Sequence, residues 1–254
     1  NPPVRLFLYP YLQSALNLKN NNTPLSAYSA GLDLKYGLTN SFTLDLTLIP
    51  DFGQVTFDDE ELNLGPFEQQ FDENRAFFSE GASLFEKADI GFRAGKFFYS
   101  RRIGQKINFN ESDYLRKNEE LLSYENKPKL LNSVKITGTT EKKLSIGIIN
   151  AITDETYAYF KNNNGEERKE IITPLSNYNI ISLTQEILND VSSISLLNTN
   201  VNRKKGANSN NTALVANIFD NKRKYNIQSA IYGSSAPRFS EKNGFRGYIS
   251  AEEL

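Results

Sequence analysis

A strict alternation of apolar and polar residues is the feature that most limits what this chain can fold into. Residues 41–48 read SFTLDLTL, with an aromatic or aliphatic side chain at every even position. Successive side chains of a β-strand point to opposite faces, so this run predicts a strand with one apolar face. Residues 28–36 alternate in the same way, and the intervening residues 37–40 predict a hairpin turn.

Similar runs recur along the rest of the chain. We expect further strands over residues 144–152, 178–183, 192–201, 213–219 and 225–232. Clusters rich in Asn, Gly and Lys separate these runs and predict turns at residues 161–165, 202–211 and 220–224. The sequence therefore predicts an all-β fold, an antiparallel up-and-down meander over residues 1–254.

Such a meander has two ordinary forms, a soluble β-sandwich and an outer-membrane β-barrel. In a membrane barrel the apolar face contacts lipid and the polar face lines the lumen. The polar faces predicted here carry mainly Thr, Ser and Asn, which suits either form. No run of about 18 apolar residues occurs, so the sequence predicts no membrane-spanning helix.

Composition excludes several classes of protein. The chain contains no Cys and no His, which excludes thiolate and imidazole metal sites, Cys nucleophiles and Ser-His-Asp catalysis. Lys and Arg number 29 against 30 Asp and Glu, and this balance argues against a nucleic-acid partner. The acidic residues at 51 and 58–60 lack EF-hand spacing and no phosphate-binding loop motif occurs, so we expect no metal and no cofactor.

Residues 51–86 interrupt the strand pattern and predict an inserted, plug-like segment. This stretch contains an acidic run and two Phe residues, at positions 67 and 71, spaced as on one face of a short helix. Residues 110–127 predict a second irregular and charged piece, a loop that could include a helical turn. Irregular segments of this length between strands are usually functional or binding loops.

Four separated motifs give the chain a family resemblance. They are IPDFGQV at 49–55, FEQQF at 67–71, ENRAFFSEG at 73–81 and FFYSRRIG at 97–104. They resemble the signature of a large family of outer-membrane-associated proteins from Bacteroidota-type bacteria. Its members pair an N-terminal domain similar to family 9 carbohydrate-binding modules with a C-terminal β-barrel-like region of unassigned function. Three later runs also fit this pattern, at residues 133–138, 174–178 and 195–201.

The resemblance implies a location in the outer membrane of a Gram-negative bacterium. The implied partners are membrane lipid, glycan and other envelope proteins, and the implied roles are glycan binding, glycan uptake or envelope structure. The chain then corresponds to the first part of a longer barrel region. The chain departs from the family pattern at two positions: Asn74 and Ala76 stand where the family tends to have Lys and Pro. The family's rigid turn before the pair Phe77 and Phe78 is therefore not implied for this chain.

The motifs supply both negatively and positively charged candidate site residues. The carboxylates are Asp51, Glu68, Glu73 and Glu80, and the arginines are Arg75, Arg101 and Arg102. Two carboxylates could act as the acid and the nucleophile or base of a glycoside hydrolase. The alternative, which we favour, is that the carboxylates pair with the arginines inside a polar lumen, because buried charges need partners.

Aromatic residues of the motifs are further candidates: Phe77, Phe78 and Tyr99. The aromatic run at residues 97–99 lies next to two arginines, so it could form a platform on which a sugar ring stacks. We favour the other interpretation, in which the rings pack in the core or at a membrane interface.

We therefore predict part of an outer-membrane β-barrel in which fixed charge pairs hold the plug-like segment in place. The residues expected to form these pairs are Glu73, Glu80, Arg75, Arg101 and Arg102. Two alternatives remain: a glycoside hydrolase-like enzyme that uses two carboxylates, and a soluble β-sandwich module that binds carbohydrate.

Overall fold

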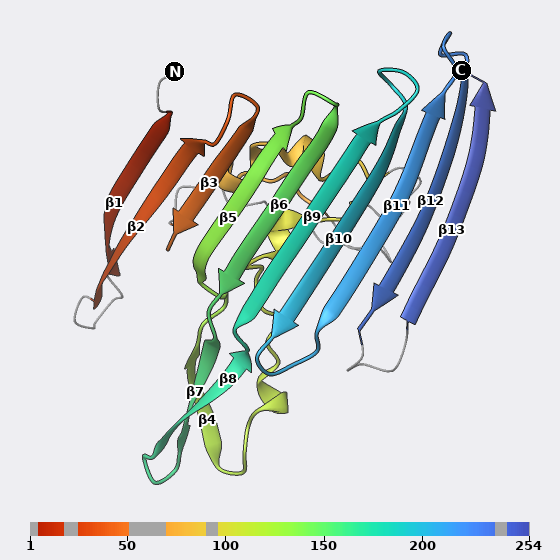
Figure 1. Cartoon of the computed structure of the whole chain (residues 1–254). Coiled ribbons are helices and arrows are strands. Elements are labelled where there is room, and N and C mark those ends of the chain that lie inside the picture. The colour runs from red at the N-terminus through yellow and green to blue at the C-terminus, as the bar shows by residue number, and fades with distance from the viewer. Residues whose placement is uncertain (1–4, 18–24, 51–69, 90–95, 237–242, 254) are drawn as a thin grey trace.

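The computed structural model describes residues 5–17, 25–50, 70–89, 96–236 and 243–253. Within these residues the chain is all-β, as the sequence predicts, with a ten-stranded and a three-stranded antiparallel sheet (Figure 1). None of the helices found there is long and apolar enough to cross a membrane.

The ten-stranded sheet is an up-and-down meander whose neighbouring strands are all antiparallel. In sheet order its strands are β1 (Leu6–Asn17), β2 (Leu25–Gly37), β3 (Phe42–Leu48), β5 (Leu130–Thr139), β6 (Leu144–Thr153), β9 (Ser176–Glu186), β10 (Ser193–Arg203), β11 (Ser209–Phe219), β12 (Tyr225–Ser235) and β13 (Asn243–Glu253). No pairing between described residues joins β1 to β13, so the sheet is open.

Two excursions leave this meander and meet below it. The first runs from β3 to β5 and ends in β4 (Glu119–Tyr124). The second runs from β6 to β9 and forms the hairpin of β7 (Thr156–Asn162) and β8 (Glu167–Thr173). Strand β4 pairs with β7, which makes the three-stranded sheet that projects from the end of the larger one (Figure 1).

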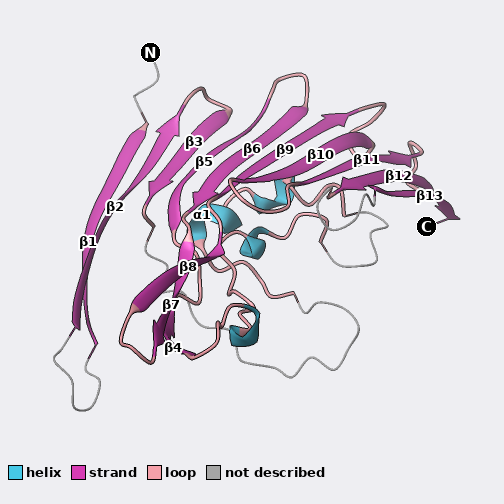
Figure 2. Ribbon diagram, turned by 90° about the horizontal axis from the view of Figure 1, so that it is seen from below, coloured by secondary structure: helices cyan, strands magenta, loops and turns pink. Residues whose placement is uncertain are grey.

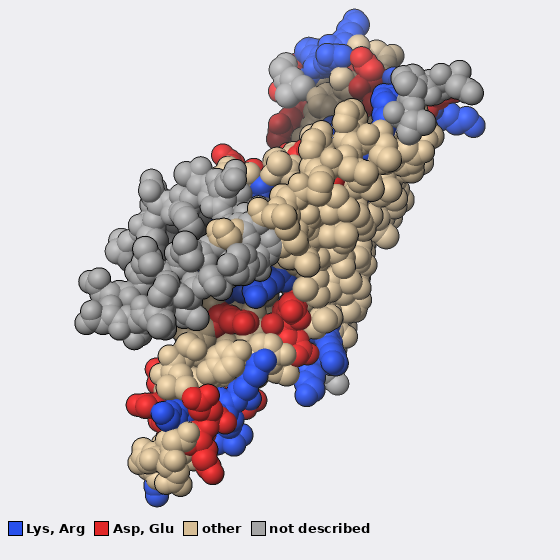
Figure 3. Space-filling model, turned by 90° about the vertical axis from the view of Figure 1, so that its left-hand side faces the viewer, with Lys and Arg blue, Asp and Glu red and all other residues tan. Residues whose placement is uncertain are grey.

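The two faces of the large sheet differ in character. On the face that we call the outer face, Ile146, Leu183, Leu196, Leu214 and Ile231 are register partners across five successive strands. Leu196, Leu214 and Ile231 expose 36–46% of their surface. Figure 3 shows this face at the right as a stretch without charged residues, with Lys, Arg, Asp and Glu gathered toward its two ends.

A row of asparagines lies beside the apolar rows on the same face. Asn150, Asn179, Asn200 and Asn210 are register partners on β6, β9, β10 and β11. The Asn150 side chain donates to Oδ1 of Asn179 at 2.8 Å. Outer-face polarity therefore changes along the strand direction, from aliphatic to amide.

Residues 70–89 and 96–118, which we call the internal segment, cover the inner face of the large sheet and end beside the three-stranded sheet. It contains α1 (Ala76–Ser79) and the 3₁₀ turns η1 (Ala82–Leu84), η2 (Ser100–Arg102) and η3 (Glu111–Asp113). The sheet curves around α1, η1 and η2, which lie in its concavity, whereas η3 lies beside the three-stranded sheet (Figure 2).

The core lies between the internal segment and the inner face of the sheet. Buried residues of the segment include Phe78, Phe85, Ala88 and Ile103, and those of the sheet include Ile149, Ala151, Ile180, Leu197, Ala213, Val215, Ala230 and Tyr232. Small inner-face residues let the segment approach closely. A Cβ added at Gly147 would lie 2.7 Å from the Phe85 ring, so this strand position needs glycine for the contact.

Two predicted boundaries are wrong. Residues 202–211 were expected to form a turn, but β10 extends to Arg203 and β11 begins at Ser209. The asparagines there continue β11 because their amides bond across the sheet: Asn210 Oδ1 accepts from the Asn198 amide at 3.2 Å, and the Asn211 amide donates to Thr199 Oγ1 at 3.4 Å. Residues 110–127, expected to be irregular, include strand β4.

Candidate functional site

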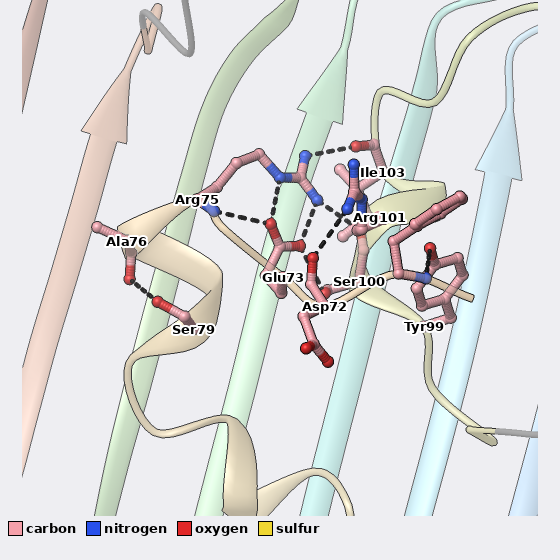
Figure 4. A network of polar contacts seen from close by, with 10 residues as sticks. Asp72, Glu73, Arg75, Ala76, Ser79, Tyr99, Ser100, Arg101 and Ile103 are labelled. Carbon is pink, nitrogen blue, oxygen red and sulfur yellow. Dashed lines mark hydrogen bonds and ion pairs between the residues drawn. The ribbon is translucent and has the colours of Figure 1, made fainter. Parts of the chain in front are cut away.

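Arg75 is the hub of a polar network inside the internal segment (Figure 4). Its Nε and Nη2 donate to the two carboxylate oxygens of Glu73 at 2.8 and 2.7 Å, a bidentate pair. Its guanidinium also donates to the carbonyls of Ile103 at 2.7 Å and Ser100 at 2.9 Å. Arg75 therefore joins the chain before α1 to the turn η2, which lies 25 residues further along.

Glu73 is buried within this network and stays ionised. Burial raises the pKa of its carboxyl, but hydrogen bonds from Arg75 and from the Ser100 hydroxyl outweigh burial and lower the pKa overall. The Phe78 ring lies 4.3 Å from the Arg75 guanidinium carbon and covers the pair. A carboxylate held in this state suits a structural ion pair and does not suit a general acid, which needs a raised pKa.

Glu80 ties the internal segment to the sheet. Its carboxylate accepts a hydrogen bond from Lys35 of β2. This bond is the main reason that the pKa of Glu80 is lowered. Glu80 and Glu73 are therefore each bound to a different cation.

A buried lysine forms the second tie between sheet and segment. Lys135 of β5 is 1% exposed, and its ammonium donates to the carbonyls of Phe77 at 2.6 Å and Glu80 at 2.8 Å. Its third partner is the Asp45 carboxylate at 3.4 Å, on the register-paired residue of β3. One cation of the sheet thus donates hydrogen bonds to two backbone carbonyls, one in α1 and one at its C-terminal end.

The same kind of contact recurs along the inner face. The Ser182 hydroxyl donates to the Leu84 carbonyl at 2.6 Å, and the Tyr232 hydroxyl donates to the Ala88 carbonyl at 3.3 Å. Side chains of β5, β9 and β12 thus supply donors to an irregular backbone that lacks sheet partners. Such pairing is required where backbone polar groups are buried.

The other candidate residues from the sequence lie near the Arg75 network and the Lys135 contacts or outside the described residues. Phe77 packs edge-on to Phe78 with ring centroids 5.0 Å apart. The Tyr99 hydroxyl accepts a hydrogen bond from the Phe71 N–H at 3.0 Å. Arg101 donates to the Asp72 carbonyl at 2.8 Å. Arg102 is exposed and lies on the edge of a cavity. Asp51 and Glu68 lie outside the described residues.

Lys135, Asp45 and Lys35 are the site residues that sequence reasoning missed. Each stands at an inner-face position of an alternating strand, among apolar outer-face neighbours. A charged residue at such a position is the signal that could have identified them. The motifs contain arginines of their own, which offer ion-pair partners to the carboxylates without any residue from the strands that face them.

A cavity of about 440 Å³ lies beside the network, between the internal segment and the inner face of β9, β10 and β11. Phe97, Tyr99 and Arg102 contribute from the segment, and Tyr178, Arg203 and Asn211 contribute from the sheet. Two candidates from the motifs, Tyr99 and Arg102, thus line one space.

Asp89 gives the internal segment a pH-sensitive point. Its Oδ1 accepts the Phe97 N–H at 2.7 Å, and burial raises the pKa of this carboxyl to about 6. The folded state therefore holds this proton more tightly than the unfolded chain, and stability contributed by the protonated form is lost as pH rises from about 4 to 6.

We expect Asp89→Asn to remove this loss, because the amide oxygen keeps the hydrogen bond without a charge. Parent and variant should be equally stable at pH 4, and the variant should be more stable at pH 7 by about 1–2 kcal/mol after solvent screening is allowed for. Urea unfolding at pH 4, 5, 6 and 7 measures the difference. A constant offset between the two proteins across this range would contradict the prediction.

These features together define a class: an open antiparallel sheet whose concave face holds an irregular segment by charge pairs and backbone acceptors. The chain belongs to the family described as "Domain of unknown function (DUF5916)", which it matches over residues 2–254. Neither a protein of curated function nor a solved structure matches it.

Proposed function

We propose that the chain forms part of the wall of an outer-membrane β-barrel and that the internal segment is its plug. In this proposal the outer face contacts lipid in the envelope of a Gram-negative bacterium. The biochemical role is structural or concerns the binding or uptake of glycan.

The observation that carries the proposal is the apolar outer face. Exposed aliphatic and aromatic side chains recur on it from one edge of the sheet to the other: Leu6, Leu8, Leu12, Leu48, Ile148, Ile181, Ile194, Leu196, Leu214, Ile227, Ile231, Phe245 and Ile249. Contiguous apolar surface of this extent is rare on soluble monomers. An outward apolar band with a polar or plugged interior is the arrangement of membrane barrels.

The inner face supports the same proposal. It carries Asp45, Lys135, Ser182 and Thr184 among small apolar residues, and all four are at most 8% exposed. A two-carboxylate enzyme has less support, because Glu73 is held by Arg75 and Glu80 by Lys35.

A pair of arginine substitutions on β12 tests the proposal. Ile231 lies in the apolar row and Ser235 in register with the asparagine row, on the same face of the same strand. In lipid, Ile231→Arg should lower the free energy of unfolding by about 2 kcal/mol or more, and Ser235→Arg by about 1 kcal/mol or less. On a water-exposed surface both changes should stay within about 0.5 kcal/mol of the parent.

The full-length parent protein is the right material for this test. Outer-membrane fractions would be run on detergent gels with and without boiling, and urea unfolding from lipid vesicles would give the stabilities. Heat-shifted migration together with the unequal variants would support the proposal. A soluble, unshifted protein in which both variants are neutral would refute it.

A further inference from the structure

We propose that the end of the large sheet that carries the asparagine row contacts the lipid headgroups of the outer leaflet, so that the three-stranded sheet stands at the cell surface. This inference rests on the proposed function and deepens it. It adds which end of the sheet faces outward and which chemical groups of the lipid that end touches. Three features support it: the lengths of the connections, the amides of the row and the lysines beyond the row.

The connections at the two ends of the large sheet differ in length. At the end away from the asparagine row, neighbouring strands are joined by four to six residues, at 38–41, 140–143, 187–192 and 220–224. The other end has one short connection at 204–208, but there the chain also leaves the sheet for the β3–β5 and β6–β9 excursions (Figure 1). Bacterial outer-membrane barrels have short turns on the periplasmic side and longer loops outside. This asymmetry favours the end beside the three-stranded sheet as the extracellular end.

The asparagine row lies at this same end. Strand β6 leaves the large sheet just beyond Asn150, and β9 enters it just before Asn179, so the row separates the apolar rows from the three-stranded sheet. At the opposite end, apolar residues continue to the turns: Ile194 and Ile227, 41% and 51% exposed, stand at the beginning of β10 and β12. Amides both donate and accept hydrogen bonds, which suits the hydroxyl, ester and phosphate groups of lipid headgroups.

Exposed lysines lie beyond the row. Lys204 and Lys205 follow β10 on the β10–β11 hairpin, and both are exposed. Lys204 lies 3.9 Å from Glu155 and exposes 69% of its side chain, so its ammonium can reach an external anion. At the opposite end, Lys143 and Lys224 lie closer to glutamates, at 3.1 and 2.9 Å. Lysine binds phosphate as a point charge, so apolar rows followed by amides and then lysines match the order of groups at a lipid surface.

The absence of Cys from the chain makes a labelling test direct. Single cysteines would be introduced into the full-length parent protein, with Asn164→Cys and Lys205→Cys at the end beside the three-stranded sheet and Lys142→Cys and Lys222→Cys at the other. All four residues are exposed. Cells that carry each variant would be treated with a maleimide-PEG too large to cross an intact outer membrane, and the parent protein gives the background.

Asn164→Cys and Lys205→Cys should be modified in intact cells, whereas Lys142→Cys and Lys222→Cys should be modified only after the outer membrane is opened. Lys205→Cys and Lys142→Cys are the same substitution at opposite ends and form the matched pair. The reverse pattern, or equal behaviour of all four positions in intact cells, overturns the inference.

Contact with headgroups is tested on one strand. Leu214 lies in the apolar row and Asn210 in the asparagine row, on the same face of β11. A fluorophore attached through Leu214→Cys should be quenched by lipids brominated in their chains, and one attached through Asn210→Cys should be quenched by spin labels on the headgroup. Quenching of both positions mainly by the brominated chains overturns the inference.

Detergent gels with and without boiling separate a failure of this inference from a failure of the proposed function. Variants that keep the heat-shifted migration of the parent but show the wrong labelling pattern refute the orientation and leave the barrel proposal standing. Absence of the heat shift from the parent and from all variants refutes the barrel proposal, and the orientation with it.

Discussion

Replacing Lys135 with methionine should destabilise the folded chain by about 3–5 kcal/mol, the largest effect that we expect from one substitution. Methionine fills a similar volume, but it leaves the Asp45 carboxylate and the carbonyls of Phe77 and Glu80 without the ammonium. Lys35 stays 4.0 Å from the other Asp45 oxygen and offsets part of its charge, but the loss of the nearer cation is costly in a site this closed, where Lys135 is 1% exposed. Urea unfolding monitored by circular dichroism measures the loss.

The control is Lys143→Met, which removes a cation from an exposed pair with Glu186 at 3.1 Å. That change should cost less than about 1 kcal/mol. Adding Asp45→Asn to Lys135→Met should recover part of the loss, since the side chain that has lost its nearer cation is then neutral. Equal effects of the two methionine variants would show that the buried cation does not hold the internal segment to the sheet.

Replacing Arg75 with glutamine should cost about 3 kcal/mol and should loosen one part of the molecule first. The change removes four hydrogen bonds from the guanidinium and leaves Glu73 buried without its cation. The pKa of Glu73 should then rise, because burial acts without the opposing hydrogen bonds of Arg75. Hydrogen exchange of backbone amides should accelerate around residues 73–79 and 99–104 before it does so in β10–β12.

The matched control for Arg75 is Arg116→Gln, where an exposed guanidinium lies 4.0 Å from Glu170. Its stability and exchange should match those of the parent within about 0.5 kcal/mol. The double variant Glu73→Gln with Arg75→Gln should be more stable than Arg75→Gln alone, since no charge is then stranded. Uniform acceleration of exchange over the sheet and the segment would contradict a local role for the network.

Alternation predicts the strands of the large sheet well because each of them has two different environments. One face packs against the internal segment and the other carries exposed aliphatic residues, so the period of two stays clear in β3, β6, β9 and β10. For the hairpin of β7 and β8 the sequence predicts only the turn, because the two strands are short and carry charged residues. Asn210 and its neighbours at the start of β11 fall in a predicted turn, because asparagine is common in turns as well as in this row.

The ion pairs of the motifs were partly predictable. A carboxylate and an arginine two residues apart, Glu73 and Arg75, do pair with each other. The tie to the sheet was not predictable in this way, since Lys135 meets carbonyls 55 and 58 residues earlier in the chain. Those acceptors are backbone oxygens of an irregular segment. Every residue type has a backbone oxygen, and tertiary packing decides which of them meet Lys135, so the sequence carries no signal for this contact.

The chain order of these contacts bears on how the molecule is assembled. The internal segment is complete before β5 begins, whereas its sheet partners Lys135, Ser182 and Tyr232 lie on β5, β9 and β12. Strands from β5 onward join the sheet in sequence order, interrupted only by the β7–β8 hairpin. Each new strand can therefore pack against a segment that is already present, so that the concave face of the sheet forms around that segment.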